Sequence, residues 1–125
     1  MIKLSDAEIY IMQIVWRNGQ ATSFDILEEV KRDKKLSENT IRTLLARMVK
    51  KKAIYVHEKY GKTYLYKPLI NRDQFLRKQG NSFLDAIYEG AIEYMMVNFV
   101  KEKRLFRKEI ENVLDIIDED WDDEK

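Results

Sequence analysis

The stretch Ser37-Glu-Asn-Thr-Ile-Arg-Thr-Leu-Leu-Ala-Arg-Met-Val-Lys-Lys51 carries the clearest periodic pattern in this chain of 125 residues. Its apolar residues recur every three or four positions, which places them on one face of a helix: Ile41, Leu44, Leu45, Met48 and Val49. Small, polar and basic residues dominate the opposite face, and no acidic residue occurs between positions 39 and 53. Ser37 is a suitable N-cap. The pattern predicts a helix with a buried apolar face and an exposed basic face.

Two more helices are predicted upstream of this stretch. Ser5-Asp-Ala-Glu8 is a capping box at the start of the first helix, and Asn18-Gly19 ends it, because glycine readily adopts a left-handed backbone. Thr22 caps the second helix, whose inward face is expected to consist of Phe24, Leu27 and Val30 with Ile26 beside them. Three helices joined by short connections are typical of a helix-turn-helix core.

A β-hairpin is predicted directly after the third helix. Residues 54–58 and 63–66 are rich in strand-forming side chains, and the Gly-containing segment 59–62 between them is a hairpin loop. Pro68 closes the second strand, because proline has no backbone N–H for further pairing. Three helices followed by a hairpin with a basic tip predict a winged helix. The alternative is a small α+β domain in which the basic turn is incidental.

The chain after residue 71 is predicted to be helical almost to its acidic tail at residues 118–125. A long helix and a second helix carry apolar residues on more than one face: Phe83, Leu84, Ile87, Tyr88, Ile92, Met95, Met96, Phe99, Ile110, Val113, Leu114 and Ile117. An appendage of this size cannot form a stable core alone, so an identical chain under two-fold symmetry is the simplest cover. We expect a mainly α chain with an α+β winged-helix domain at residues 1–70 and a C-terminal helical dimerisation domain at residues 71–125.

The net charge of +1 hides two halves of opposite sign. Residues 1–82 carry 17 Lys and Arg against 9 Asp and Glu, whereas residues 83–125 carry 6 against 13. Such a split favours a nucleic-acid-binding part joined to a part that avoids nucleic acid. The absence of cysteine, of a signal peptide and of a long apolar segment predicts a cytoplasmic protein without membrane insertion.

Signatures of catalysis are missing from the sequence. It contains no P-loop, no G-x-G-x-x-G, no G-x-S-x-G and no H-E-x-x-H. His57 is the only histidine, and a plain strand residue is the simpler interpretation of it than a catalytic group. The acidic tail lacks the glycine and the ligand spacing of an EF-hand loop. We therefore expect no catalytic residue, no metal site and no cofactor.

Double-stranded DNA is the partner that the residue types of the third helix fit. A helix can enter the major groove, where arginine pairs with guanine, asparagine pairs with adenine, and threonine hydrogen-bonds or packs against thymine. The candidate base contacts lie in the first turns of this helix: Asn39, Thr40, Arg42 and Thr43. Other cations are better placed for phosphates or the minor groove: Arg47 and Lys50 on the helix, and Lys59 and Lys62 at the hairpin. Tyr60 at the turn is a further candidate, as a stacking residue.

The third helix closely resembles the recognition helix of the penicillinase and methicillin-resistance repressor family. Leu4-Ser-Asp-Ala-Glu8 with Met12 and Val15-Trp16 resembles the first helix of that family, and Lys67-Pro-Leu69 and Ser82-Phe-Leu84 are similar to later motifs. The resemblance covers roughly residues 4–117. It implies a homodimeric repressor of a β-lactam-resistance operon, with winged helices on a palindromic operator and C-terminal helices that form the dimer.

The resemblance also implies a release mechanism. In the family, a membrane sensor with a metalloprotease domain detects the antibiotic, and the repressor is then cut at an Asn-Phe bond in its dimerisation helices. The matching bond in this sequence is Asn98–Phe99, within Val97-Asn-Phe-Val100. Phe99 is also interpretable as a core side chain, and the two roles are compatible.

Two departures from the family pattern are visible in the sequence. The family often has glycine just after the third helix, whereas this chain has Lys52, so either Lys52 adopts a left-handed backbone or the turn differs. The copper-responsive branch of the superfamily has a cysteine-rich site, which a chain without cysteine cannot form. Two alternatives stay open: a repressor of another operon, released by another protease or a small molecule, and a winged helix that binds an acidic protein. The polar face of the third helix argues against the second, because protein docking favours apolar or aromatic anchors.

Overall fold

The computed structural model of this chain describes residues 2–120, and the chain divides into two compact units, Met1–Leu76 and Arg77–Lys125. The first unit contains α1 (Asp6–Asn18), β1 (Ala21–Thr22), α2 (Ser23–Lys34), α3 (Glu38–Lys50), β2 (Ile54–Tyr60) and β3 (Thr63–Pro68). The boundary falls within α4 (Arg72–Tyr88), and the second unit continues with α5 (Ile92–Lys101) and α6 (Arg107–Asp120). Residues 121–125 of the expected acidic tail lie outside the described part.

The predicted helix caps are confirmed. The Ser5 hydroxyl accepts a hydrogen bond from the Glu8 N–H, and the Glu8 carboxylate accepts one from the Ser5 N–H, which completes the capping box of α1. Thr22 and Ser37 cap α2 and α3 in the same way, each by accepting from a backbone N–H three residues later. Gly19 ends α1 with a φ of 79°, a conformation that glycine adopts without steric cost. Local chemistry therefore fixes where each of the three helices begins.

The core of the first unit lies among these three helices and the sheet. Its most deeply buried side chains include Ile11, Met12, Val15, Ile26, Ile41, Met48 and Ile54. The predicted inward position of Phe24 is wrong, because its side chain is 59% exposed. Ser23 faces the core instead, and its hydroxyl accepts a hydrogen bond from the Tyr64 N–H at 2.9 Å. A polar link between α2 and the sheet thus takes the place of an apolar contact.

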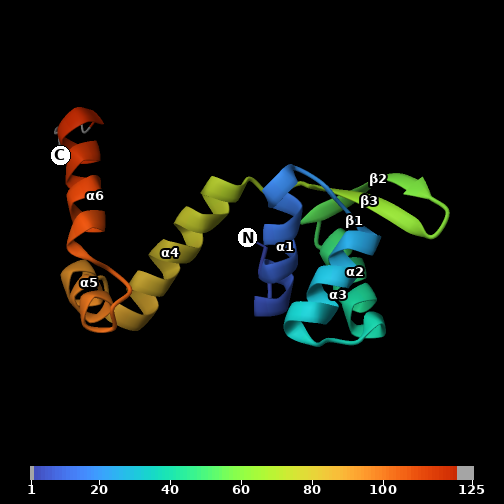
Figure 1. Cartoon of the computed structure of the whole chain (residues 1–125), viewed down its shortest axis with the longest axis horizontal. Coiled ribbons are helices and arrows are strands. Elements are labelled where there is room, and N and C mark those ends of the chain that lie inside the picture. The colour runs from blue at the N-terminus through green and yellow to red at the C-terminus, as the bar shows by residue number, and fades with distance from the viewer. Residues whose placement is uncertain (1, 121–125) are drawn as a thin grey trace. The chain divides into compact units, whose positions relative to one another are not determined.

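The hairpin belongs to a three-stranded antiparallel sheet with the order β1-β3-β2. The sequence-based prediction lacks β1, which pairs Ala21 with Tyr66 and Thr22 with Leu65. The predicted loop 59–62 is too long, because β2 continues to Tyr60 and pairs it with Thr63, which leaves only two residues in the turn. Figure 1 shows this hairpin projecting from the three-helix core. The winged helix predicted from the sequence is confirmed.

The second unit contains more helices than the sequence predicts. The single long helix expected from the sequence is interrupted between α4 and α5, where Glu89 and Gly90 have φ values of 52° and 82°. A further turn, with Lys103 at a φ of 59°, separates α5 from α6. None of the described residues from 77 to 119 is buried, and Ile87 is 63% exposed. Taken by itself, this unit leaves its apolar side chains exposed or only partly covered.

The chain adopts a left-handed backbone at Lys52, just after α3. The sequence left open whether Lys52 adopts this conformation or the turn differs, and the structure shows the first. Lys52 has a φ of 65°, its N–H donates to the Val49 carbonyl at 3.0 Å, and the Ala53 N–H donates to the Met48 carbonyl at 2.9 Å. These two bonds and the buried pair Met48 and Ala53 form a Schellman motif. A lysine here bears a steric cost that glycine would not.

We expect Lys52→Gly to raise the free energy of unfolding by about 0.5–1 kcal/mol, because the relief of left-handed strain exceeds the extra chain entropy of glycine. Chemical denaturation of the intact chain measures this change. Ala46→Gly, at an exposed position inside α3, is the control and should lower the free energy of unfolding by a similar amount, about 0.5–1 kcal/mol. A Lys52→Gly variant that is less stable than the wild type would contradict the strain.

A buried carboxylate joins the start of α1 to the end of α3. Glu8 is 1% exposed, and its Oε1 atom accepts hydrogen bonds from Lys51 Nζ at 2.7 Å and from the Ser5 N–H at 2.9 Å. Lys51 Nζ also donates to the Lys3 carbonyl at 2.9 Å. Burial raises the pKa of Glu8, but the hydrogen bonds from Lys51 and Ser5 and the charge of Lys51 outweigh it, so the pKa is lowered from its ordinary value of 4.5. This ion pair fixes the end of α3 relative to α1.

The lowered pKa of Glu8 predicts a loss of stability in acid. Its contribution is fully present above pH 4.5 and is lost as the pH falls through the lower pKa of the folded state. We expect Lys51→Met to flatten this dependence and to lower the free energy of unfolding at neutral pH by about 1–3 kcal/mol, nearer the smaller figure because water reaches Lys51. Denaturation at several pH values tests both, with Lys50→Met as the control. An unchanged acid dependence in Lys51→Met would contradict the assignment.

Candidate nucleic-acid interface

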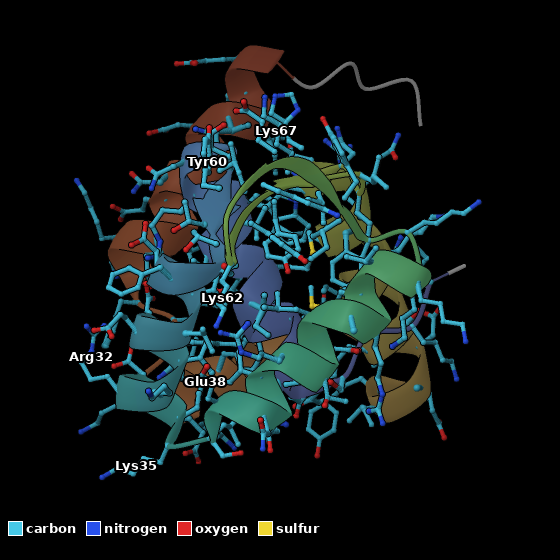
Figure 2. The ribbon with its side chains drawn as sticks, turned by 90° about the vertical axis from the view of Figure 1, so that its right-hand side faces the viewer. Arg32, Lys35, Glu38, Tyr60, Lys62 and Lys67 are labelled. Atoms are coloured by element: carbon cyan, nitrogen blue, oxygen red, sulfur yellow. The ribbon has the colours of Figure 1, made fainter. Side chains whose placement is uncertain are left out.

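The exposed face of α3 brings together all six residues that the sequence proposes for this helix. Its N-cap at Ser37 and its buried stripe fix the rotation of the helix, so that the other face is open to solvent. Every candidate on it is exposed: Asn39, Thr40, Arg42, Thr43, Arg47 and Lys50. Figure 2 views the molecule from this side. A polar and basic surface of one helix, with its first turns free, has the form that a major groove accepts.

Two of the candidate hydroxyl groups already have partners. Thr43 Oγ1 donates to the Asn39 carbonyl at 2.9 Å, and Thr40 Oγ1 shares a hydrogen bond of 2.9 Å with Ser37 Oγ. The structure gives the side chains of Asn39 and Arg47 no hydrogen bond within residues 2–120. The Asn39 amide therefore has no partner in this part of the chain, while the Thr43 hydroxyl is already used and leaves mainly its methyl group exposed.

Arg42 is held by a residue that the sequence-based prediction did not include. Its Nε and Nη2 atoms lie 3.0 and 2.8 Å from the same oxygen, Glu38 Oε2. Both side chains are about half exposed, at 48% for Arg42 and 49% for Glu38, and an exposed pair of this kind contributes only about 0.3–0.5 kcal/mol to stability. The i,i+4 spacing of Glu38 and Arg42 was the available signal.

The hairpin tip carries two lysines and an exposed tyrosine that were proposed as DNA contacts. Lys62 occupies the turn, and Lys59 places Nζ 5.3 Å from the centre of the Tyr64 ring, a cation–π distance. Tyr60 is 56% exposed, and its hydroxyl donates to Glu58 at 2.7 Å, a hydrogen bond that raises the pKa of Tyr60. Of the three hairpin candidates, Lys62 is the one for which the structure shows no side-chain partner within residues 2–120.

A groove of about 790 Å³ separates α3 from the hairpin. Charged side chains on its wall come from both elements: Glu38 and Arg42 from α3, and Lys62 from the hairpin turn. Apolar and aromatic side chains form much of the rest, including Leu45, Val49, Val56, Tyr64 and Tyr66. Figure 2 labels Glu38 and Lys62 on this side of the molecule. The recognition helix and the wing therefore present their charges on the same side.

The candidate cleavage site lies in the last turns of α5. The Asn98 carbonyl accepts a hydrogen bond from the Glu102 N–H at 2.9 Å, and the Asn98 side-chain amide donates to Tyr88 Oη at 3.2 Å. The Phe99 carbonyl accepts from the N–H groups of Arg104 and Leu105. Phe99 itself is 38% exposed. The bond is thus inside hydrogen-bonded structure, and its apolar neighbour is only partly covered within one chain.

Neither a membrane-crossing helix nor a metal-binding group is found in residues 2–120. Each helix in that range is too short or too polar to span a bilayer, and no three His, Asp or Glu side chains gather as ligands.

A three-helix core, a β-hairpin wing and an exposed polar helix define a winged-helix DNA-binding protein. The sequence model of the penicillinase repressor family matches residues 4–119, and the chain belongs to that family.

Named relatives and a solved structure agree with this membership. The chain is 30% identical to the penicillinase repressor of Bacillus licheniformis over 94% of this chain and 91% of the relative. It is 32% identical to the methicillin resistance regulatory protein MecI of Staphylococcus aureus strain N315, over 92% of this chain and 93% of the relative. It is also similar to the solution structure of monomeric Bacillus licheniformis BlaI in complex with the blaP half-operator, at a TM-score of 0.50 and 30% identity over 58% of this chain and 87% of that one. These relatives are repressors and not enzymes, which agrees with the prediction from the sequence.

Proposed function

We propose that this chain is a homodimeric, sequence-specific transcriptional repressor of a β-lactamase or other β-lactam-resistance operon, and that it acts on a palindromic operator in the cytoplasm. The exposed face of α3 is the observation that carries this proposal. Asn39 and Arg42 offer hydrogen bonds to base edges, and Lys50 and Lys62 offer charge to phosphates. Family membership supplies the class of operon.

Support for DNA binding comes from both similarity and chemistry. The similar BlaI chain is solved in complex with a half-operator. In this chain, the cations of α3 and of the wing give the affinity that depends on salt, whereas Arg42, Asn39 and the Thr43 methyl group give the sequence preference. We expect half-sites one helical turn of DNA apart, or a small multiple, because two heads related by two-fold symmetry must meet the same side of the duplex.

Support for a homodimer comes from the apolar side chains of the second unit. Exposed examples occur on each of its helices, including Phe83 and Ile87 on α4, Ile92 and Met96 on α5, and Val113, Leu114 and Ile117 on α6. Leu84, Tyr88, Met95 and Ile110 are only partly covered. A second copy of the same unit covers such surfaces with an isologous interface. The dimer then links two winged helices for one palindrome.

Release of the operator is proposed to follow cleavage of the Asn98–Phe99 bond by a membrane sensor with a metalloprotease domain, as the family resemblance implies. The bond lies in α5, which follows α4 and precedes α6 along the chain, and both of these helices carry apolar residues of the proposed dimer interface. Cutting it separates α6 from the winged helix. The dimer interface then loses apolar surface while the winged helix keeps its own core.

Footprinting on the region upstream of the gene, with a salt titration of the affinity, tests the repressor proposal. We expect protection of a palindrome and a steep fall in affinity with salt. Binding without a preferred sequence would exclude an operator-specific repressor. A protected palindrome that controls genes unrelated to β-lactam resistance would make the chain a repressor of another operon. Sedimentation of the free protein tests the dimer in the same preparation.

A further inference from the structure

We propose that Glu38 is a positioning residue that makes Arg42 selective for guanine. This inference rests on the proposed operator binding, because it concerns how the same helix reads its sequence. Glu38 lies at the first position of α3, one turn before Arg42, and both side chains line the groove between α3 and the hairpin. No other acidic residue lies on the exposed face of α3.

The hydrogen-bond geometry leaves the useful edge of the guanidinium free. Arg42 Nε donates a hydrogen bond to Glu38 Oε2 at 3.0 Å, and Nη2 lies 2.8 Å from the same oxygen, so the carboxylate lies along the side edge of the planar group. A guanidinium has five N–H donors, and those of Nη1 together with the second N–H of Nη2 remain. Guanine O6 and N7 accept two parallel hydrogen bonds from such a pair. The ion pair and a guanine contact are therefore compatible at the same time.

Arg42 paired with Glu38 should differ from an unpaired arginine in its preference for base edges over phosphates. A free arginine has many rotamers and contacts phosphates along any sequence, which gives affinity without discrimination. Glu38 restricts those rotamers before DNA arrives, so less freedom is lost when Arg42 meets a base. The carboxylate also repels phosphates close to it. Both effects favour the base edge over the DNA backbone, so Glu38 should raise specificity while lowering non-specific affinity.

An ordinary surface ion pair is the alternative explanation. Such a pair would change the stability of α3 and would lower the binding of all duplexes alike, without changing the preference among bases. The two explanations differ in the ratio of affinities for right and wrong bases, which a loss of stability does not alter. Glu38→Gln is the suitable variant, because it removes the charge and keeps the shape of the side chain.

Selection from a library of randomised duplexes by the full-length protein tests the proposal. The wild type should enrich a palindrome with a strongly preferred guanine in each half-site. Glu38→Gln should enrich the same palindrome with the guanine preference in each half-site reduced about twofold, which is the size that an exposed pair of this kind allows. Its affinity for an unselected duplex should rise several-fold. Glu28→Gln removes the same charge from the exposed surface of α2 and should behave like the wild type in both measurements.

A double-mutant cycle with Arg42→Ala then shows whether Glu38 acts through Arg42. In the Arg42→Ala background, Glu38→Gln should cause no further loss of preference at that base pair. The inference would be overturned if Glu38→Gln kept the guanine preference of the wild type. It would also be overturned if Glu38→Gln reduced this preference equally in the wild-type and the Arg42→Ala backgrounds. Neither result would contradict the repressor proposal. A wild type that enriches no sequence would instead overturn operator binding itself, and the role of Glu38 with it.

Discussion

A chain that ends at Asn98 is expected to bind its operator about 10²–10⁴-fold more weakly than the intact chain, because its two winged helices no longer bind as one linked pair. The truncation removes α6 with its apolar residues Ile110, Val113, Leu114 and Ile117. It also removes the Phe99 carbonyl, which accepts hydrogen bonds from the N–H groups of Arg104 and Leu105 in the connection to α6. The winged helix keeps its own core, since every buried side chain among residues 2–119 lies between positions 8 and 75.

Titration of the footprinted duplex with the intact chain and with residues 1–98 measures this loss. Sedimentation of both forms shows whether the dimer is lost at the same concentrations. A single half-site duplex should bind the two forms with similar affinity, because each winged helix is intact. A chain that lacks only residues 121–125 keeps α6 and is the matched control. If residues 1–98 stay dimeric and bind the full operator as tightly as the intact chain, cleavage cannot be the release step.

Arg42→Ala is expected to reduce the preference for the operator over unrelated DNA by about 5- to 150-fold, which corresponds to about 1–3 kcal/mol for one bidentate contact to guanine. The effect is larger for the dimer, because the operator presents two half-sites. Arg42 lies on the exposed face of α3, at the wall of the groove, so its loss leaves the core of the winged helix unchanged. Competition between operator and unrelated duplexes gives the ratio directly.

Lys50→Ala is the matched control for Arg42→Ala. Lys50 lies on the same exposed face, two turns further along α3, where a phosphate contact is expected. Its removal should weaken binding to all sequences similarly and reduce the slope of affinity against salt by roughly one unit for each half-site. A uniform effect of Arg42→Ala, like that of Lys50→Ala, would place Arg42 on the DNA backbone and not on a base.

Those parts of the fold that depend on local chemistry were predictable from the sequence. Ser5, Thr22 and Ser37 cap their helices as expected, because a cap is a hydrogen bond between residues three positions apart. The apolar stripe of α3 was predictable for the same reason, since helical periodicity alone decides which face is buried. These local signals were sufficient to identify the winged helix.

The parts that depend on long-range contacts were not predictable. β1 has two residues and exists because β3 pairs with it, and nothing in Ala21-Thr22 favours a strand over a loop. The inward position of Ser23 depends on the Tyr64 N–H, 41 residues away in sequence, and the apolar character of Phe24 therefore misled the prediction. Glycine at position 90 did signal the end of α4, but apolar spacing that continues across it suggested one long helix.

The exposure of the candidate residues on α3 was predictable from the sequence, and their hydrogen bonds were not. All six residues proposed on α3 are exposed on one face, because the rotation of the helix follows from its buried stripe. The internal bond of Thr43 and the hold of Glu38 on Arg42 depend on rotamers, which the sequence does not specify. The sequence therefore proposes the surface, and the structure shows which side chains on it have a hydrogen-bond partner within residues 2–120.

Because the Asn98–Phe99 bond lies in the last turns of α5, local opening of this helix precedes cleavage in the proposed release mechanism. The carbonyl groups of Asn98 and Phe99 are both hydrogen-bonded, and a protease needs an extended segment, so this part of the helix must open before each cut. When opening is slower than cleavage, the time between the antibiotic signal and gene expression follows the rate of opening and not the amount of protease. In that case, substitutions that loosen this turn would shorten the response time.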